Sequence, residues 1–385
     1  MDSSSERDAA DRAEPSSNQV RTINLALQGG GAHGAFTWGV LDRLLDEKEL
    51  AFEGLSATSA GAMNAAAFAY GLAVGGRDGA RKALTDYWRR VSEAARLGPL
   101  QPTLIDRMLA DHRLSWSPVF SMIGFVSRML SPYQFNPTNY NPLRNVVEQS
   151  IDFDVLQRPD CPVKLFLSAT NVRTGKVKIF TGKEISVDAV MASACLPTMF
   201  HAVEIDGEAY WDGGYMGNPA IFPLIYGCES ADIVIVHINP LFRAEVPRSA
   251  DDILNRINEI SFNSSLMREM RAVSFVTRLV TQKRVDGGLK HVLIHSISDD
   301  AFMAHSRPPA NTTPTGTFLF SSATRAENAR TAGLPKILPN SASSPRWTLS
   351  RCISDAGYAT IPLASFGGFA WCGSSCENGI GRPNR

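Results

Sequence analysis

Two short apolar segments near the start of the chain each end in a cluster of small residues and then lead into a helical pattern. Residues 22–27 are strand-like and run into the glycine-rich segment 29–34, after which residues 35–48 carry apolar side chains at helical spacing. Residues 52–58 form a second strand-like run that leads directly to Ser59 and an alanine-rich helical stretch. This order of strand, loop, helix, strand, turn and helix predicts a parallel sheet covered by helices.

The rest of the first 300 residues continues this alternation. The alanine-rich helix after Ser59 is expected to end at Gly75-Gly76, because glycine terminates helices readily. Apolar runs and helical spacing further along predict strands at 163–170, 177–180, 231–238 and 290–297, and helices at 77–97, 187–194 and 250–280.

Composition divides the chain into a core and three atypical segments. Residues 1–20 are acidic and rich in serine, which predicts a disordered leader, and residues 21–300 are expected to form one α/β domain. Residues 100–145 are apolar, aromatic and interrupted by prolines; they are typical of a cap over an apolar site or of an insertion packed on the core, and we favour the insertion. Residues 305–385 show no helical or strand period. We interpret them as a disordered extension or as the product of a frame shift near residue 302.

Charge and cysteine content exclude several classes of function. Lys and Arg together number 38, as do Asp and Glu, so no overall charge attracts nucleic acid. The six cysteines are scattered, which fits neither a disulfide framework nor a metal cluster. No signal sequence or apolar run long enough for a membrane span is seen, so we expect a cytoplasmic protein without a transmembrane segment.

Ser59 lies in the pentapeptide Ala57-Thr58-Ser59-Ala60-Gly61, between the second strand and the alanine-rich helix. A serine at a tight strand-to-helix turn projects its hydroxyl out of the backbone, as in the G-x-S-x-G turn of acyl hydrolases. Ala57 replaces the first glycine of that pattern. The pentapeptide is weak as an isolated signal, because small residues also occur where helices pack closely.

The segment Gly29-Gly30-Gly31-Ala32-His33-Gly34 matches G-x-G-x-x-G, which allows two interpretations. A dinucleotide-binding loop needs an acidic residue at the end of the second strand, and Glu53 lies at its beginning instead. Alternatively, the backbone N–H groups of these glycines stabilise an oxyanion, aided by the positive end of the following helix.

Serine needs a base to act as a nucleophile, and the sequence offers two kinds. Asp212, in Asp212-Gly213-Gly214, is a carboxylate candidate. Among the histidines, His201 is a reserve base, His33 is expected to mark a helix start, and His237 is expected to be a hydrogen-bonded core residue. No histidine has a nearby acidic residue in the sequence to orient it, so a Ser-His-Asp triad is not required.

Four blocks together resemble the patatin-like phospholipase family over about residues 22–295. They are Gly29–Gly34, the Ser59 turn, residues 192–200 and Asp212-Gly213-Gly214, in the family's order. The resemblance implies a three-layer α/β/α fold with a mainly parallel sheet, lipid acyl hydrolysis without cofactor or metal, and a lipid or membrane-surface substrate that the protein reaches as a peripheral enzyme.

The resemblance also assigns roles to individual residues. It implies that Ser59 is the nucleophile, Asp212 the base, Gly30 and Gly31 oxyanion donors with Ala60 as a further donor, and Pro197 part of the substrate wall. The remaining motif positions are Gly29, Gly34, Ala57, Gly61, Gly213 and Gly214. His33 stands where the family often has a basic residue, and Ala57 is expected to cost some stability.

Three alternatives to lipid hydrolysis remain open from the sequence. The substitution at Ala57 and the atypical segment 305–385 also fit a non-catalytic lipid-binding or scaffold protein with a degenerate domain. A nucleotide-binding module is the second alternative. Transfer of the acyl group to an acceptor other than water, which would use the same residues, is the third.

Overall fold

The structure, a computed structural model, describes residues 20–97, 130–243, 245–282 and 289–299. Within them, eight strands form one sheet in the order β5-β6-β3-β2-β1-β7-β8, with β4 paired to β3 beside this path. The strands are β1 Arg21–Leu27, β2 Leu50–Ala57, β3 Lys164–Asn171, β4 Val177–Thr181, β5 Val203–Ile205, β6 Glu208–Asp212, β7 Asp232–Val236 and β8 Leu293–Ile297.

The centre of the sheet is parallel and one side is antiparallel. Strands β3, β2, β1, β7 and β8 pair in parallel, with Leu25 opposite Leu55 and Leu27 opposite Ala57. The short strands β4 and β6 run antiparallel to β3, and β5 runs antiparallel to β6. The predicted mainly parallel sheet is thus confirmed. The loops that follow β1 and β2 leave the same edge, since the carboxyl ends of parallel strands lie together.

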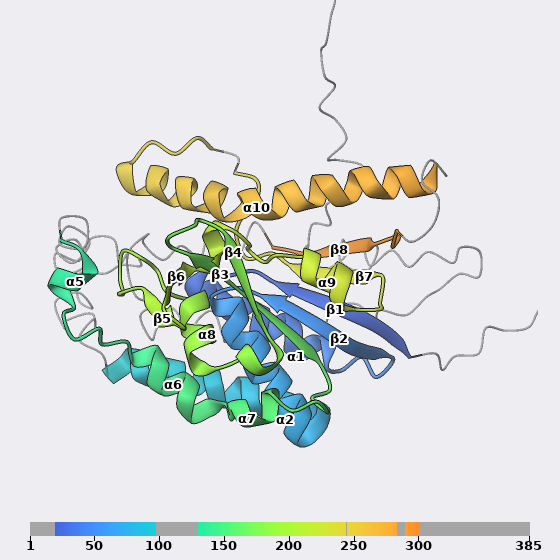
Figure 1. Ribbon diagram of the computed structural model, residues 1–385, viewed down its shortest axis with the longest axis horizontal. Helices are drawn as coiled ribbons and strands as arrows, with labels where there is room; N and C mark the ends of the chain where they lie inside the picture. The colour runs from blue at the N-terminus through green and yellow to red at the C-terminus, as the bar shows by residue number, and fades with distance from the viewer. Residues whose placement is uncertain (1–19, 98–129, 244, 283–288, 300–385) are drawn as a thin grey trace, which may run out of the picture.

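Helices cover both faces of this sheet (Figure 1). Helix α10 crosses one face together with the short α9, whereas α1, α2, α6, α7 and α8 lie on the other. The α-helices are α1 Gly34–Leu44, α2 Ala60–Leu97, α5 Pro132–Phe135, α6 Pro142–Ser150, α7 Phe153–Leu156, α8 Val187–Ser193, α9 Phe222–Gly227 and α10 Ala250–Thr281; the 3-10 turns are η1 Gly31–His33, η3 Gly182–Glu184 and η4 Gly213–Tyr215.

Two hydrophobic cores result from this layering. Alternate residues of a strand face opposite sides of a sheet. Leu25 and Leu27 of β1 therefore belong to the core beneath α1 and α2, while Ala26 belongs to the core beneath α9 and α10. That second core contains Leu266 and Met270 of α10 together with Ile233 and Ile235 of β7, so α10 is held against the sheet by burial of its apolar face. The fold is the expected three-layer α/β/α arrangement.

Helix α2 is broken where the sequence predicts a helix end. Gly75 and Gly76 have non-helical dihedral angles, with a positive φ of 59° at Gly76 that favours glycine. The chain then folds back on itself. A Cβ on Gly71 would lie 2.4 Å from the Cα of Ala80. Trp88 on the second half donates a 2.9 Å hydrogen bond from Nε1 to Asn64 Oδ1 on the first half.

The predicted leader, the predicted tail and most of the segment 100–145 lie outside the described residues. The end of that segment is described and contributes to α5 and α6. Leu143, in the part of α6 that belongs to this segment, packs against the main core, in which Val146 and Val147 just after the segment are buried. Within the described residues, no helix has both the length and the apolar character that a bilayer span needs.

Candidate active site

Ser59 occupies a strained turn between β2 and α2. Its φ of 54° places a non-glycine residue in the left-handed region, which costs about 1–3 kcal/mol and occurs most often at functional sites. The residue is almost fully covered, at 8% exposure. A Cβ on Gly61 would lie 2.4 Å from the carbonyl oxygen of Leu27, and one on Gly29 would lie 2.5 Å from the Cβ of Ser59. Both glycines are therefore needed for the close approach of the two turns.

The glycine-rich loop and the Ser59 turn meet at the same edge of the sheet. A Cβ on Gly34, at the start of α1, would lie 2.8 Å from the Cβ of Ala60, at the start of α2. The amino ends of α1 and α2 thus converge here, and each carries partial positive charge. Gly31, with φ of 59°, begins η1, and a Cβ added to it would meet no atom within 4 Å, so it faces open space.

Asp212 ends β6 and caps the turn η4. The register of β6 against β3 places it opposite Ala169. Its backbone N–H donates to the Cys195 carbonyl at 2.7 Å, and its own carbonyl accepts from Thr170 Oγ1 at 2.8 Å. Its Oδ1 accepts a 2.7 Å hydrogen bond from the Gly214 N–H. The backbone and one carboxylate oxygen of Asp212 are therefore held from three directions.

The two glycines after Asp212 allow this close packing. A Cβ on Gly213 would lie 2.1 Å from the Ser168 carbonyl oxygen, and one on Gly214 would lie 2.9 Å from Asp212 Oδ1. The Asp-Gly-Gly motif is therefore required by contact with β3 and with the carboxylate itself.

The Asp212 carboxylate is fully buried next to Ser59. Burial raises its pKa from 3.8 to about 6, while hydrogen bonds from Gly214 and from the Ser59 side chain oppose that shift. The Ser59 hydroxyl therefore lies at the carboxylate. Oδ2 has no hydrogen-bond partner within the described residues.

Two buried side chains support this geometry through contacts that the motifs around them do not reveal. Ser193 Oγ, at the end of α8, accepts a 2.9 Å hydrogen bond from the Ser59 N–H. Thr58 Oγ1 donates to the Gly217 carbonyl at 2.6 Å, which ties the Ser59 turn to the segment after η4. Each contact joins residues more than 130 positions apart, so no local pattern could reveal it.

The three histidines considered from the sequence, His33, His201 and His237, lie in different surroundings. His33 takes the N-cap position of α1, so its prediction as a helix-start residue is confirmed. His201 stacks on Tyr133 at 4.0 Å between ring centroids, and its Nε2 lies 3.2 Å from the Pro132 carbonyl; no hydrogen bond to Ser59 is found among the described residues.

His237 requires a correction. It is buried, as expected for a core residue, and burial lowers its pKa to about 4. The expectation of a hydrogen-bonded ring is wrong for Nδ1, which has no partner within the described residues. The ring is neutral at physiological pH.

The remaining sequence-predicted position, Pro197, lies in a turn after α8. The Leu196 carbonyl accepts from the N–H groups of Met199 and Phe200 at 3.0 and 3.1 Å, which closes this turn around Pro197. Cys195, two residues before Pro197, contacts the Asp212 backbone, so the block 192–200 reaches the site through its first half. Within the described part of the chain, no group of three or more His, Cys, Asp or Glu side chains is placed to hold a metal ion.

Comparison with known proteins agrees with this arrangement. The family model for patatin-like phospholipases matches residues 25–225, more than half of the chain. The chain belongs to the patatin-like phospholipase family. Its match spans the glycine-rich loop, Ser59 and Asp212.

The crystal structure of VipD from Legionella pneumophila is similar at 14% identity with a TM-score of 0.36; the match covers 80% of this chain and 65% of the VipD chain. This patatin-like chain therefore matches less than two thirds of that protein. The search of curated proteins gave no match.

Proposed function

We propose that the protein is a lipid acyl hydrolase of the phospholipase A or lysophospholipase type that acts through Ser59 and Asp212. The observation that carries the proposal is the position of Ser59, in a strained turn, beside a fully buried carboxylate whose pKa is about 6. Strain at a non-glycine residue and a buried, pKa-shifted acid are both features that concentrate at active sites. Membership of the patatin-like family supports fatty acyl esters as the substrate class.

The reaction follows from these positions. Asp212 accepts the proton of the Ser59 hydroxyl, and the Ser59 oxygen attacks the ester carbonyl to form a tetrahedral oxyanion. The N–H groups of Gly30 and Gly31, with Ala60 as a further donor, stabilise that oxyanion at the converging amino ends of α1 and α2. The alcohol leaves as the bond to it breaks and takes up the proton from Asp212. Water, deprotonated by the same carboxylate, then attacks the acyl carbonyl; the bond to the Ser59 oxygen breaks, that oxygen takes the proton back from Asp212, and the fatty acid leaves.

The buried carboxylate suits the role of a base without histidine. A pKa near 6 leaves Asp212 ionised at neutral pH, yet more basic than an ordinary aspartate. The Gly214 N–H holds Oδ1, which leaves Oδ2 as the oxygen that can take the proton.

The glycine-rich loop favours the oxyanion interpretation over nucleotide binding. A ribose-binding acid would be needed at the carboxyl end of β2, where the chain instead has Ser59. Glu53 is occupied elsewhere, since its carboxylate accepts from the N–H groups of Glu229 and Ser230 at 2.7 and 2.8 Å. These bonds lie toward the amino end of β2, away from the Ser59 turn.

Fluorophosphonate labelling and hydrolysis of p-nitrophenyl esters test the proposal together. We expect the wild-type protein to be labelled at Ser59, and the substitutions Ser59→Ala and Asp212→Asn to lower kcat by about 10⁴-fold or more. Asp206→Asn is the matched control, because Asp206 is an exposed acid in the turn of the same β5–β6 hairpin. Full activity in either active-site variant would contradict the dyad.

The same experiment separates the alternatives. Lipid binding without labelling would identify a non-catalytic lipid-binding protein. Labelling together with acyl transfer to an added alcohol or lysolipid in preference to water would identify an acyltransferase that uses the same residues.

A further inference from the structure

Buried amide side chains surround the main chain of Gly29, directly before the proposed oxyanion donors. They come from the end of β1, from the segment after η4, from the segment after β7 and from α10, and all are almost fully covered: Gln28, Asn218, Asn239 and Asn263. Burying four amides is unfavourable unless they are hydrogen-bonded, so their partners show what this cluster holds in place.

Gly29 is the common partner of two of these amides. Its carbonyl accepts from Asn239 Nδ2 at 2.6 Å and from Asn218 Nδ2 at 3.2 Å. Its N–H donates to Asn218 Oδ1 at 2.6 Å. Asn218 therefore bonds both the N–H and the carbonyl of Gly29, and Asn239 donates the shorter of the two hydrogen bonds to that carbonyl.

The Gly29 carbonyl and the Gly30 N–H belong to one planar trans peptide, in which they point in opposite directions. Because the two asparagines hold the Gly29 carbonyl in one direction, the Gly30 N–H is held pointing in the opposite direction, away from both asparagines. Two donors on the carbonyl also polarise the peptide, which makes the N–H a stronger hydrogen-bond donor.

Asn239 is in turn oriented by Gln28. Gln28 Oε1 accepts from the backbone N–H groups of Ile238 and Asn239 at 3.0 and 3.1 Å and from Asn239 Nδ2 at 3.3 Å. Gln28 Nε2 donates to the Asn218 carbonyl at 3.2 Å and to Asn263 Oδ1 at 3.0 Å. The Nδ2 group of Asn239 thus has two acceptors, Gln28 Oε1 and the Gly29 carbonyl.

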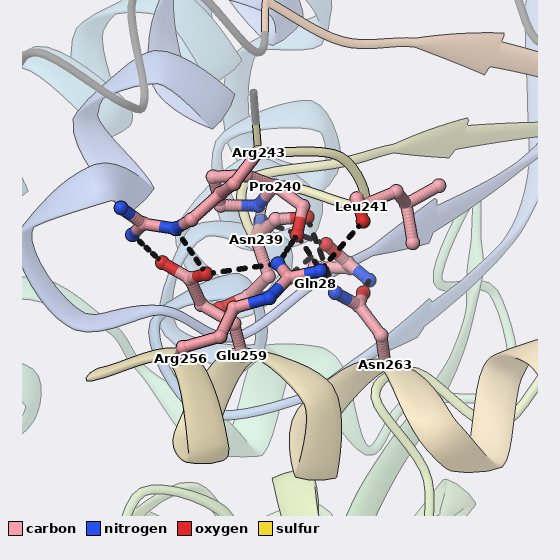
Figure 2. Close-up of polar contacts among 8 residues, drawn as sticks. All are labelled: Gln28, Asn239, Pro240, Leu241, Arg243, Arg256, Glu259 and Asn263. Carbon is pink, nitrogen blue, oxygen red and sulfur yellow. Dashed lines mark hydrogen bonds and ion pairs between the residues drawn. The ribbon is translucent and has the colours of Figure 1, made fainter. Parts of the chain in front are cut away.

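Helix α10 holds the segment that carries Asn239 (Figure 2). Arg256 donates to the carbonyls of Pro240 and Leu241 at 3.2 and 3.0 Å, and Glu259 pairs with both Arg256 and Arg243. In Figure 2 the side chains of Arg256 and Glu259 project from α10 toward this segment, as does that of Asn263. The position of Asn239 is therefore set by the second layer of helices.

We propose that Asn239 and Asn218 are positioning residues that aim the Gly30 N–H at the oxyanion of the tetrahedral intermediate. The proposal rests on the function proposed above and adds two residues to it. Neither side chain touches the substrate; each acts through the Gly29–Gly30 peptide. A rotated peptide would weaken transition-state stabilisation while leaving substrate binding and the Ser59–Asp212 pair in place.

The test uses Asn239→Leu, which keeps the size of the side chain but removes its donor. We expect kcat for p-nitrophenyl butyrate to fall about 10- to 100-fold, below the loss of an entire oxyanion donor, with KM changed less than about 3-fold. The affinity for a trifluoromethyl ketone, whose adduct with Ser59 carries an oxyanion, should fall by the same factor. Rates are expressed per site labelled by fluorophosphonate, so a smaller folded fraction cannot mimic the effect.

Asn24→Leu is the matched control. Asn24 is a fully buried asparagine that donates at 3.0 Å to the Ser230 carbonyl, toward the amino end of the central strands. We expect it to lower stability without lowering kcat or ketone affinity per labelled site. If Asn239→Leu does not fold, Asn239→Ala is judged by the same two measurements.

Unchanged ketone affinity in the folded Asn239 variant, or an equal loss in Asn24→Leu, would overturn the positioning role alone. A wild-type protein that is neither labelled nor inhibited by the ketone would overturn the proposed function, and the positioning role with it.

Discussion

The backbone N–H of Ser59 donates a 2.9 Å hydrogen bond to the Oγ of Ser193, which lies 134 residues further along the chain. Ser59 has a positive φ, so the turn needs support from its surroundings to persist. Ser193 ends α8, and two residues later the Cys195 carbonyl accepts from the Asp212 N–H. One short segment thus holds the backbone of both members of the proposed dyad.

Substitution of Ser193 by alanine is predicted to impair stability and activity together. It leaves the Ser59 N–H buried without its acceptor, which costs about 1–3 kcal/mol in the free energy of unfolding. A turn that relaxes from its strained φ also moves the Ser59 hydroxyl, and we expect kcat/KM to fall at least about 10-fold. Urea denaturation and ester hydrolysis measure the two effects.

Ser168→Ala is the control for that substitution. Ser168 is also a fully buried serine, but its Oγ has no hydrogen-bond partner within the described residues. Its removal should change stability by less than about 1 kcal/mol. Equal effects of the two substitutions would show that the Ser193 hydrogen bond has no special role.

The pH dependence of hydrolysis is predicted to follow Asp212. The carboxylate must be ionised to accept a proton, and burial raises its pKa to about 6. We therefore expect kcat/KM, which reports the free enzyme, to fall tenfold per pH unit below about pH 6. Cys195 and Tyr215 lie beside Asp212, but their pKa values are raised to about 12, so they stay neutral across this range. A profile that stays flat down to pH 4.5 would exclude Asp212 as the base.

The sequence predicts the fold well because the signals for its elements are local, and it names Ser59 and Asp212 as the candidate dyad, which stays a prediction. The alternation of strands and helices and the break at Gly75-Gly76 follow from short-range patterns, and the structure contains both. Parallel strands then bring the Gly29–Gly34 loop and the Ser59 turn to one edge without further information.

The supporting contacts could not be predicted in the same way. Ser193, Asn218 and Asn239 hold backbone atoms that are 134 to 210 residues away, and even the block 192–200 that contains Ser193 does not show which backbone group its side chain meets. The missing partner of His237 Nδ1 is equally invisible, since an apolar run indicates burial but not which polar atoms lie within reach.

Replacing Asp212 by asparagine is predicted to stabilise the protein above pH 6 while abolishing activity. The pKa of Asp212 in the folded state, about 6, exceeds its usual value of 3.8, so the folded state binds the extra proton between these values. Stability therefore falls as pH rises from about 4 to 6, and it stays lower above that range. Asparagine carries no charge and can still accept from Gly214, so the variant should gain on the order of 1–3 kcal/mol at pH 8 and nothing near pH 4.

Urea denaturation at pH 4.5 and pH 8 measures that difference. Asp206→Asn, at an exposed turn, should show no pH-dependent gain. An Asp212→Asn variant that is less stable than the wild type at pH 8 would contradict the prediction. It would mean that hydrogen bonds stabilise the ionised carboxylate by more than burial destabilises it.

The substitution Gly29→Ala is predicted to disable the site through contact with Ser59 itself. The added Cβ would lie 2.5 Å from the Ser59 Cβ and 2.8 Å from the Thr58 carbonyl oxygen, both too close for real atoms, so either the loop or the turn must move. Overpacking of this kind costs about 1–3 kcal/mol of stability, and a displacement near 1 Å at the nucleophile costs about 100-fold in rate. Gly75→Ala is the matched control, because no atom lies within 4 Å of its Cβ position and its φ of −156° is not in the left-handed region. Fluorophosphonate labelling should slow about 100-fold in Gly29→Ala and stay at the wild-type rate in Gly75→Ala; equal labelling rates in the two variants would show that the loop and the Ser59 turn are not in contact as described.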